Sequence, residues 1–174
     1  MKEYNVIDLF AGVGGLSYGF SGMPEFHILA ANEIERDIAA AYSLNHPGVT
    51  MLNCDICALT ESALLEATGR QQIDIVIGGP PCQSYSTLGK RRLDEKASLF
   101  LQYKRILQLL KPRAFVFENV VGLLSMDHGR LFPQIQAEFR EIGYCLKHRV
   151  LDAVDFGVPQ HRERVILVGF RGEN

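Results

Sequence analysis

Residues 73 to 86 read "IDIVIGGPPCQSYS", and this stretch predicts how the chain is organised. Its first residues form a short apolar run that is typical of a buried strand. The strand cannot continue through Pro80 and Pro81, because proline has no backbone N–H for the ladder. Cys82 therefore stands on a constrained loop directly after a strand. Taken alone, the stretch is also compatible with a rigid loop that carries an incidental cysteine.

Outside this stretch, apolar runs alternate with helical patterns. Strands are predicted at residues 4–9, 26–32, 50–53, 73–78, 114–119, 145–152 and 164–170. Helices are predicted at residues 15–22, 35–45, 60–68, 97–110 and 130–142. Strands separated by helices indicate an α/β fold with a doubly wound, mostly parallel, seven-stranded sheet of the Rossmann-like kind. Ligands of such sheets bind beyond the carboxyl ends of the strands, so the residues after each strand are the ones to examine.

Bulk properties exclude several classes of protein. The 174 residues suit one domain, and the net charge of −2 is not that of a protein that holds nucleic acid by charge alone. The sequence has no apolar run long enough for a membrane span and no signal peptide, which favours a cytoplasmic chain with no membrane partner. The pair Cys54 and Cys57 has the C-x-x-C spacing, but without a second pair we expect no metal site.

Three segments after predicted strands favour an adenosine-containing cofactor. The first strand leads into the glycine-rich turn "AGVGG" at 11–15, the second into Glu33, and the third into Asp55. Glycines let the backbone approach a ligand, and an acid about twenty residues later commonly binds ribose hydroxyls. Two alternatives remain, in which Asn32 and Glu33 begin a helix and Asp55 caps a turn.

Groups suited to catalysis follow the remaining strands. Glu118 ends the apolar run "AFVF", where a carboxylate is costly to bury unless it has a partner. Arg162 and Arg164 alternate at the start of the last strand and would point to one face. A nicotinamide enzyme would not need Cys82 on a stiffened loop, and a pure binding module would need neither Cys82 nor Glu118.

These residues carry a resemblance to a known family. In order along the chain they are "DLFAGVGG", "NEI", "CDI", "GGPPCQSYS", "ENV" and "QHRER". With these motifs, which cover nearly the whole chain, the sequence closely resembles the catalytic core of the DNA cytosine-5 methyltransferases. His161 stands where the family often has a basic residue.

The resemblance implies S-adenosylmethionine as the cofactor, with S-adenosylhomocysteine as its product. The implied cofactor site comprises Phe10, Ala11, Gly12, Gly14, Gly15, Glu33, Ile34, Asp55, Ile56, Pro80 and Leu99. Within this set, Glu33 would hold the ribose and Asp55 the adenine. The carbonyl of Pro80 would contact the amino group of a flipped cytosine.

The resemblance also implies a covalent mechanism on duplex DNA, with Cys82, Glu118, Arg162 and Arg164 as its catalytic residues. Cys82 would add to C6 of a cytosine that is flipped out of the helix. Glu118 would bond or protonate N3, and Arg164 would hold the O2 oxygen. A bound water is a plausible base for the C5 proton.

The family pattern extends further than residues 1–174, which correspond to its catalytic and cofactor-binding core. The target-recognition domain and the C-terminal family segment are absent from the sequence, so we expect a fragment, one subunit of a split enzyme with a complementary chain, or a remnant. A bacterial restriction–modification setting fits best. An idle cofactor-binding module and a transfer RNA methyltransferase remain as alternatives.

Overall fold

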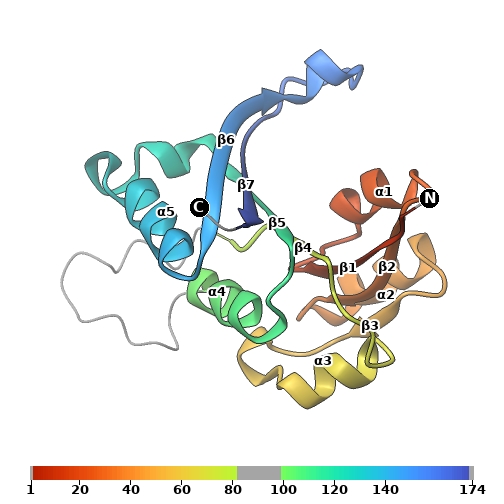
Figure 1. Ribbon diagram of the computed structural model, residues 1–174. Helices are drawn as coiled ribbons and strands as arrows, with labels where there is room; N and C mark the ends of the chain where they lie inside the picture. The colour runs from red at the N-terminus through yellow and green to blue at the C-terminus, as the bar shows by residue number, and fades with distance from the viewer. Residues whose placement is uncertain (1, 82–98, 173–174) are drawn as a thin grey trace.

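Seven strands form one sheet in the computed structural model, which describes residues 2–81 and 99–172 (Figure 1). Their order across the sheet is β3-β2-β1-β4-β5-β7-β6. The strands are β1 (Tyr4–Leu9), β2 (Phe26–Asn32), β3 (Thr50–Leu52), β4 (Ile75–Gly78), β5 (Ala114–Val120), β6 (Tyr144–Asp152) and β7 (Glu163–Arg171). Every predicted strand is present, and the ends differ by at most two residues.

The first five strands pair in parallel, whereas β7 runs antiparallel between β5 and β6. The prediction of a doubly wound, mostly parallel sheet is therefore confirmed. The antiparallel register pairs Val120 at the end of β5 with Arg164 at the start of β7. The beginning of β7 consequently lies at the same sheet edge as the carboxyl ends of the parallel strands.

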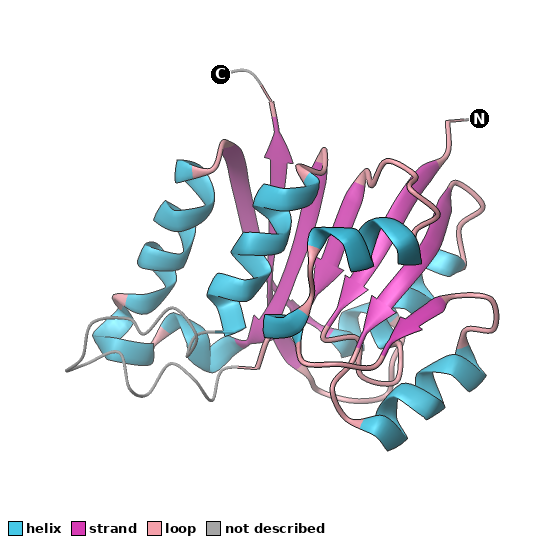
Figure 2. Ribbon diagram, turned by 90° about the horizontal axis from the view of Figure 1, so that it is seen from below, coloured by secondary structure: helices cyan, strands magenta, loops and turns pink. Residues whose placement is uncertain are grey.

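Helices cover both faces of the sheet (Figure 2). They are α1 (Gly15–Ser21), α2 (Arg36–Asn45), α3 (Glu61–Ala67), α4 (Leu99–Leu110) and α5 (Leu131–Glu141). All five predicted helices are present; the first two residues of the predicted 97–110 helix lie outside the described residues. None of the helices in the described ranges is long and apolar enough to cross a membrane.

The main hydrophobic core lies between the sheet and helices α3, α4 and α5. Tyr103 of α4 and Phe139 of α5 are fully buried against Phe115 and Phe117, which alternate along β5. The single O–H of Tyr103 is shared between the backbone carbonyls of Val76 in β4, at 3.2 Å, and of Val116 in β5, at 3.0 Å. Burying an aromatic or large aliphatic side chain stabilises the fold by about 1.5–3 kcal/mol, so this aromatic cluster fixes α4 on the sheet.

A second, smaller core lies on the opposite face, under α1 and α2. Ala11, Ala31 and Tyr42 form it, and Ser17 of α1 is completely buried beside them. Asp8 alternates with the apolar residues of β1 and is also completely buried, hydrogen-bonded to Ser17. The strand therefore places a carboxyl group directly beneath the glycine-rich turn.

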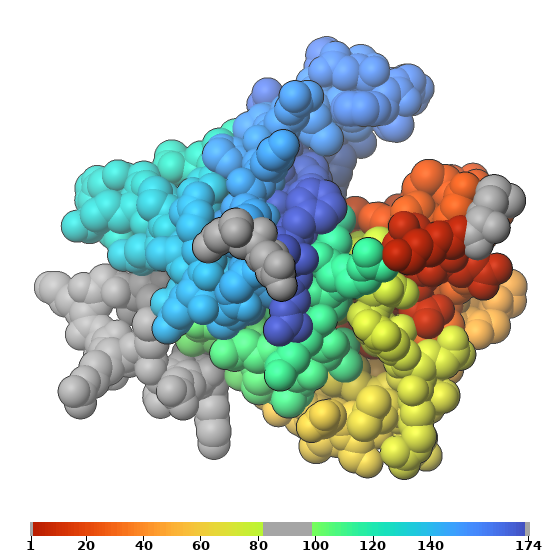
Figure 3. Space-filling view, viewed as in Figure 1, coloured from red at the N-terminus to blue at the C-terminus, as the bar shows by residue number. Residues whose placement is uncertain are grey.

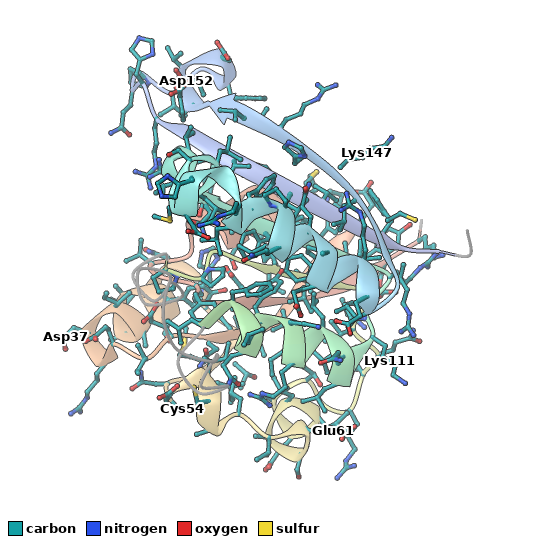
Figure 4. The ribbon with its side chains drawn as sticks, turned by 90° about the vertical axis from the view of Figure 1, so that its left-hand side faces the viewer. Asp37, Cys54, Glu61, Lys111, Lys147 and Asp152 are labelled. Carbon is teal, nitrogen blue, oxygen red and sulfur yellow. The ribbon has the colours of Figure 1, made fainter. Side chains whose placement is uncertain are left out.

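β6 and β7 form a long hairpin that projects from the body (Figures 1 and 3). Asp152 lies near its tip (Figure 4), where its side chain caps a short 3₁₀ turn, η5 (Ala153–Phe156). Apolar side chains remain exposed here, including Phe156 with 67% of its surface accessible. Along β5 and β7, Val120 and Phe170 are also exposed on the face opposite the main core.

Candidate active site

The turn after β1 has a backbone that favours glycine. Gly12 and Gly14 have φ angles of 57° and 95°, in the left-handed region that is costly for residues with a Cβ. A Cβ on Gly14 would lie 2.1 Å from His46 Nε2, which is within hydrogen-bond distance (3.0 Å) of the Gly14 carbonyl oxygen. Gly14 thus lets α2 approach the turn closely.

Glu33 connects this turn to the end of β2. One carboxylate oxygen accepts a hydrogen bond from the Gly12 N–H at 3.0 Å, and the other accepts one from the Glu35 N–H at 3.0 Å. The half-buried carboxylate therefore fixes the position of the glycine turn relative to the start of α2. Sequence reasoning placed Glu33 and the glycines at the same sheet edge but did not anticipate this direct contact.

Asn32 does not cap a helix, so that alternative interpretation is wrong. Helix α2 begins at Arg36, and its N-cap residue is Glu35. The Asn32 amide instead donates to the backbone carbonyl of Leu52, the last residue of β3, and to that of Cys54, each at 2.9 Å. The buried amide of Asn32 therefore ties the end of β2 to the end of β3 and to the residues that follow it.

Asp55 caps the short 3₁₀ turn η1 (Ile56–Ala58), as one of the sequence interpretations predicted. Its Oδ1 accepts a hydrogen bond from the Cys57 N–H at 2.8 Å. Ile56 is buried, which anchors the turn in the main core. The cap presents the side chain of Asp55 at the carboxyl edge of β3.

A pocket of about 390 Å³ opens between these segments and the first residue of α4. This volume lies within the range of small-molecule sites, about 300–1,000 Å³. The pocket is lined by Phe10, Asn32, Glu33, Ile34, Glu35, Asp55, Ile56, Gly79, Pro81 and Leu99. Six of these were predicted from the sequence for a cofactor site: Phe10, Glu33, Ile34, Asp55, Ile56 and Leu99.

The other predicted cofactor residues lie near this pocket without lining it. Ala11 is packed in the small core with Tyr42, and Gly14 faces His46. Gly12 reaches the pocket region only through its bond to Glu33, and Gly15 begins α1. Pro80 is buried next to the lining residues. Four lining residues were missed, although each belongs to a quoted motif or directly flanks one: Asn32, Glu35, Gly79 and Pro81.

Glu118 and Arg164 form an ion pair at the same edge of the sheet. Glu118 Oε1 lies 2.9 Å from Arg164 Nε, and about a quarter of each side chain is exposed. The partner that a carboxylate at this position requires is therefore Arg164. Gly79 lies against the other oxygen of Glu118, since a Cβ built on Gly79 would be 2.7 Å from Oε2. Gly79 thus separates the pocket from the ion pair.

Asn119 fixes the loop that leads to Cys82, which sequence reasoning did not foresee. Its side-chain amide donates a hydrogen bond to the Pro80 carbonyl at 3.0 Å, and its Oδ1 accepts one from the Val120 N–H at 2.9 Å. Asn119 is buried between β5 and the proline loop. Cys82 itself lies outside the described residues, so the structure places only the residues that precede it.

Arg162 directly precedes β7 and is exposed. Its backbone N–H donates to Asp152 Oδ1 at 2.7 Å, and Asp152 Oδ2 lies 2.9 Å from His161 Nδ1. The hydrogen bond to His161 holds the pKa of Asp152 below its usual range, and the same contact raises the pKa of His161. Asp152 therefore fixes the backbone of the segment that leads into Arg164.

Asp8 is a buried ionisable group at the start of the motif "DLFAGVGG", and the sequence analysis gave it no role. Its Oδ2 accepts a hydrogen bond from the Ser17 hydroxyl at 2.7 Å, and Ser17 also contacts the Tyr42 hydroxyl at 2.7 Å. Asp8 Oδ1 is buried without a hydrogen-bond partner among the described residues. Burial raises the pKa of Asp8 from 3.8 to about 7, and the nearby charge of Glu33 acts in the same direction.

The C-x-x-C pair shows no metal-binding arrangement. Cys54 is half-buried and Cys57 is exposed, and burial raises the pKa of both thiols. Within residues 2–81 and 99–172, no cluster of three or more His, Cys, Asp or Glu side chains could hold a metal ion.

Comparisons with solved structures support the architecture. A prophage-encoded protein of E. coli, solved as a candidate DNA modification methyltransferase, superposes with a TM-score of 0.82 at 28% identity, over 97% of this chain and 47% of that one. The Dnmt2 methyltransferase of S. pombe gives a TM-score of 0.74 at 25% identity, over 99% of this chain and 53% of that one.

Comparisons with curated sequences point the same way. The Type II methyltransferase M1.HphI of Haemophilus parahaemolyticus is 40% identical over 94% of this chain, and the chain spans 45% of its length. M.AquIA of Picosynechococcus is 38% identical over 97% of this chain, which spans 73% of that relative. The family model described as C-5 cytosine-specific DNA methylase matches residues 4–174. The chain therefore belongs to the family of C-5 cytosine-specific DNA methylases.

Proposed function

We propose that this chain transfers a methyl group from S-adenosylmethionine to C5 of cytosine in duplex DNA, as the catalytic core of a longer or split enzyme. The observation that carries the proposal is the junction at Gly79. On one side of Gly79 lies the pocket, and on the other lies the Glu118–Arg164 pair. The loop that continues from Pro81 leads to Cys82, so a cofactor site and a base site would share one wall.

The pocket residues fit S-adenosylmethionine. Phe10, Ile34, Ile56 and Leu99 give it apolar walls for an adenine ring, and Ile34 keeps 58% of its surface exposed there. Glu33 and Asp55 add two carboxylates, which suit ribose hydroxyls, an adenine amino group and the positive charge of the cofactor. When bound there, the cofactor supplies the methyl group that C5 of the activated cytosine takes.

Cys82 activates the cytosine in this proposal. Its thiolate forms a bond to C6, and the electron pair of the C5–C6 double bond moves toward C5, where the methyl group is accepted. Removal of the C5 proton by a base, for which bound water is a plausible choice, then restores the double bond and expels the thiolate. The target carbon is stacked inside duplex DNA, so the cytosine has to be flipped out first.

Glu118 and Arg164 stabilise the charge that builds up on the ring. Once its carboxylate holds a proton, Glu118 would bond N3 through that proton or deliver it to N3, and Arg164 would hold O2. Their ion pair keeps both groups in place before the substrate arrives, so little reorganisation is needed during the reaction. Arg162, held through its backbone by Asp152, would add positive charge that favours the Cys82 thiolate.

A complementary part that carries target recognition is included in the proposal. The chain spans less than half of the length of M1.HphI. Apolar side chains such as Phe170 and Val120 are exposed on β7 and β5, and Phe156 is exposed on the projecting hairpin. A second segment or chain could cover such surfaces. The proposal places the whole assembly on bacterial DNA in the cytoplasm, as in a restriction–modification system.

Covalent trapping tests the proposal. The chain is incubated with S-adenosylmethionine and mixed-sequence duplex DNA that contains 5-fluorocytosine, with and without the complementary part. Because fluorine cannot leave as a cation, a methylated DNA adduct on Cys82 should accumulate and be absent in Cys82→Ala. An adduct that needs the complementary part supports a split catalytic core. If calorimetry detects no binding of S-adenosylhomocysteine, or if Cys82→Ala still transfers methyl groups, the proposal is wrong.

A further inference from the structure

One wall of the pocket is a single short turn. Asp55 and Ile56 line the pocket and begin the segment 55–59, which we call the adenine-side turn. Two short-range backbone bonds close it, from Ala58 to Asp55 at 2.9 Å and from Leu59 to Ile56 at 3.2 Å, besides the bond from the Cys57 N–H to the Asp55 side chain. A 3₁₀ turn of this length has poor hydrogen-bond geometry and needs external contacts to keep one conformation.

Arg105 of helix α4 provides such contacts. Its Nη2 donates to the Ile56 carbonyl at 2.7 Å, and its Nη1 donates to the Leu59 carbonyl at 2.8 Å. Its Nε donates to Gln102 Oε1 at 2.7 Å, which orients the guanidinium plane from the same helix. The planar guanidinium therefore binds two carbonyls of the adenine-side turn at once, those of Ile56 and Leu59. A single ammonium group cannot reproduce this geometry.

The same helix also contributes a residue to the wall of the pocket. Leu99, the first residue of α4, lines the pocket, whereas Arg105 is absent from its lining. Their separation of six positions corresponds to about 9 Å along the helix axis. Figure 4 shows α4 beside the segment that carries Cys54 and Glu61, and the two elements are in contact. Arg105 thus sets the distance between two walls without touching what lies between them.

The neighbouring cation on α4 has a different role and offers a matched control. Lys104 forms ion pairs with Glu138 and Glu141 of α5, the second at 2.8 Å, and among the described residues its hydrogen bonds go to α5 and not to the adenine-side turn. These contacts tie α4 to α5 and contribute to the stability of the fold. Loss of Lys104 should therefore leave the turn and the pocket unchanged.

We propose that Arg105 is a positioning residue of the cofactor site, which holds the adenine-side turn so that Asp55 and Ile56 face Leu99 across the pocket. The role rests on the proposed function, because it assigns this pocket to the cofactor. Arg105 acts through the turn and contacts neither cofactor nor DNA. Its loss should weaken binding of the adenosine part of the cofactor while the fold persists.

The experiment compares Arg105→Gln, Arg105→Lys and Lys104→Gln with the wild-type chain. Calorimetry measures the dissociation constants of S-adenosylhomocysteine and of 5′-methylthioadenosine, which lacks the amino-acid part. We expect Arg105→Gln to weaken both ligands about tenfold and by the same factor, since the loss lies on the adenosine side. Arg105→Lys should recover part of the loss, and Lys104→Gln should bind like the wild type.

Hydrogen exchange of the backbone amides supplies a readout that needs no ligand. In Arg105→Gln, the amides of Cys57, Ala58 and Leu59 should exchange faster, while strands β1 and β4 keep their protection. Wild-type protection of the turn in Arg105→Gln, or unchanged affinity for both ligands, would overturn the role. So would an equal loss of affinity in Lys104→Gln, which would indicate a general effect on stability.

The failure of the proposed function would look different. If the wild-type chain itself binds neither S-adenosylhomocysteine nor 5′-methylthioadenosine, the pocket is not a cofactor site and the assigned role of Arg105 falls with it. The hydrogen-exchange comparison would then still report whether Arg105 orders the turn. The calorimetry and the hydrogen exchange together show which statement is wrong: that Arg105 holds the adenine-side turn, or that the pocket binds the cofactor.

Discussion

Glu118 and Arg164 lie 46 positions apart in the sequence, and yet Glu118 Oε1 is 2.9 Å from Arg164 Nε. The contact exists because β7 runs antiparallel to β5, which places the start of β7 beside the end of β5. Both side chains come from the sheet face opposite the main core. The pair therefore joins two motifs, "ENV" and "QHRER", into one site.

A double-mutant cycle tests this pair. Glu118→Gln and Arg164→Met remove the two charges and keep the shapes of the side chains, including the apolar stem of the arginine. Because three quarters of each side chain is buried, we expect a coupling free energy of about 1–2 kcal/mol in urea unfolding. A coupling near zero would mean that the two groups do not hold each other in solution.

Gly78, the last residue of β4, and Gly79, which follows it, should respond differently to substitution by alanine. A Cβ on Gly78 would meet the Leu9 carbonyl at 2.5 Å and the Tyr103 ring at 2.9 Å, both in the packed interior. Gly78→Ala should therefore lower the free energy of unfolding by about 1–3 kcal/mol.

Gly79→Ala should instead act on Glu118, one of the proposed catalytic groups. Its Cβ would be 2.7 Å from Glu118 Oε2, and a carboxylate can move away. We expect stability within about 1 kcal/mol of the wild type and a methyl-transfer rate at least tenfold lower, measured with labelled S-adenosylmethionine in the presence of the complementary part. Full activity of Gly79→Ala would show that the position of Glu118 does not matter.

Asn119→Ala should slow catalysis without weakening the binding of the cofactor. The amide of Asn119 holds the Pro80 carbonyl, and loss of this bond frees the loop that leads to Cys82. We expect kcat to fall by about tenfold to a hundredfold and the dissociation constant of S-adenosylhomocysteine to stay within about twofold. Equal losses in kcat and in cofactor affinity would instead indicate a general disturbance of the site.

Much of this arrangement can be predicted from the sequence, because apolar periodicity places every strand and helix. Helix α4 is a good example: Tyr103 and Ile106 repeat at helical spacing, and both are fully buried. The residues after the strands could also be anticipated, since parallel strands bring their carboxyl ends to one edge.

Contacts between distant residues could not be predicted in the same way. Nothing in the local pattern around Arg105 indicates that its guanidinium binds two carbonyls in another segment. The same holds for Asn119 and the Pro80 carbonyl. One of the two interpretations made Asn32 a helix cap because its residue type favours caps, but in the structure its amide meets the backbone carbonyls of Leu52 and Cys54. Such contacts depend on tertiary packing, and the local preferences of a residue type carry no information about it.

Asp8 should make the stability of the protein depend on pH. Burial raises the pKa of Asp8 from 3.8 to about 7, so the folded protein keeps this proton over a range in which the unfolded chain has lost it. Between these values the folded state binds more protons, and its stability must therefore fall as the pH rises. The full effect, reached above pH 7, is roughly 4 kcal/mol.

Comparison with Asp8→Asn isolates this contribution, because all other ionisable groups are shared. The asparagine keeps an oxygen that can accept the Ser17 bond, and its amide occupies the place of the unpartnered Oδ1. From pH 5 to pH 8, the wild type should lose about 2–3 kcal/mol of unfolding free energy relative to the variant, measured by urea denaturation.

Ser17→Ala provides the second arm of the same test. The hydrogen bond from Ser17 lowers the pKa of Asp8 and so opposes the effect of burial. Without this bond the pKa of Asp8 should rise further, and the decline in stability should continue to a higher pH before it levels off. A difference between wild type and Asp8→Asn that stays constant from pH 5 to pH 8 would show that Asp8 is already ionised in the folded protein at pH 5.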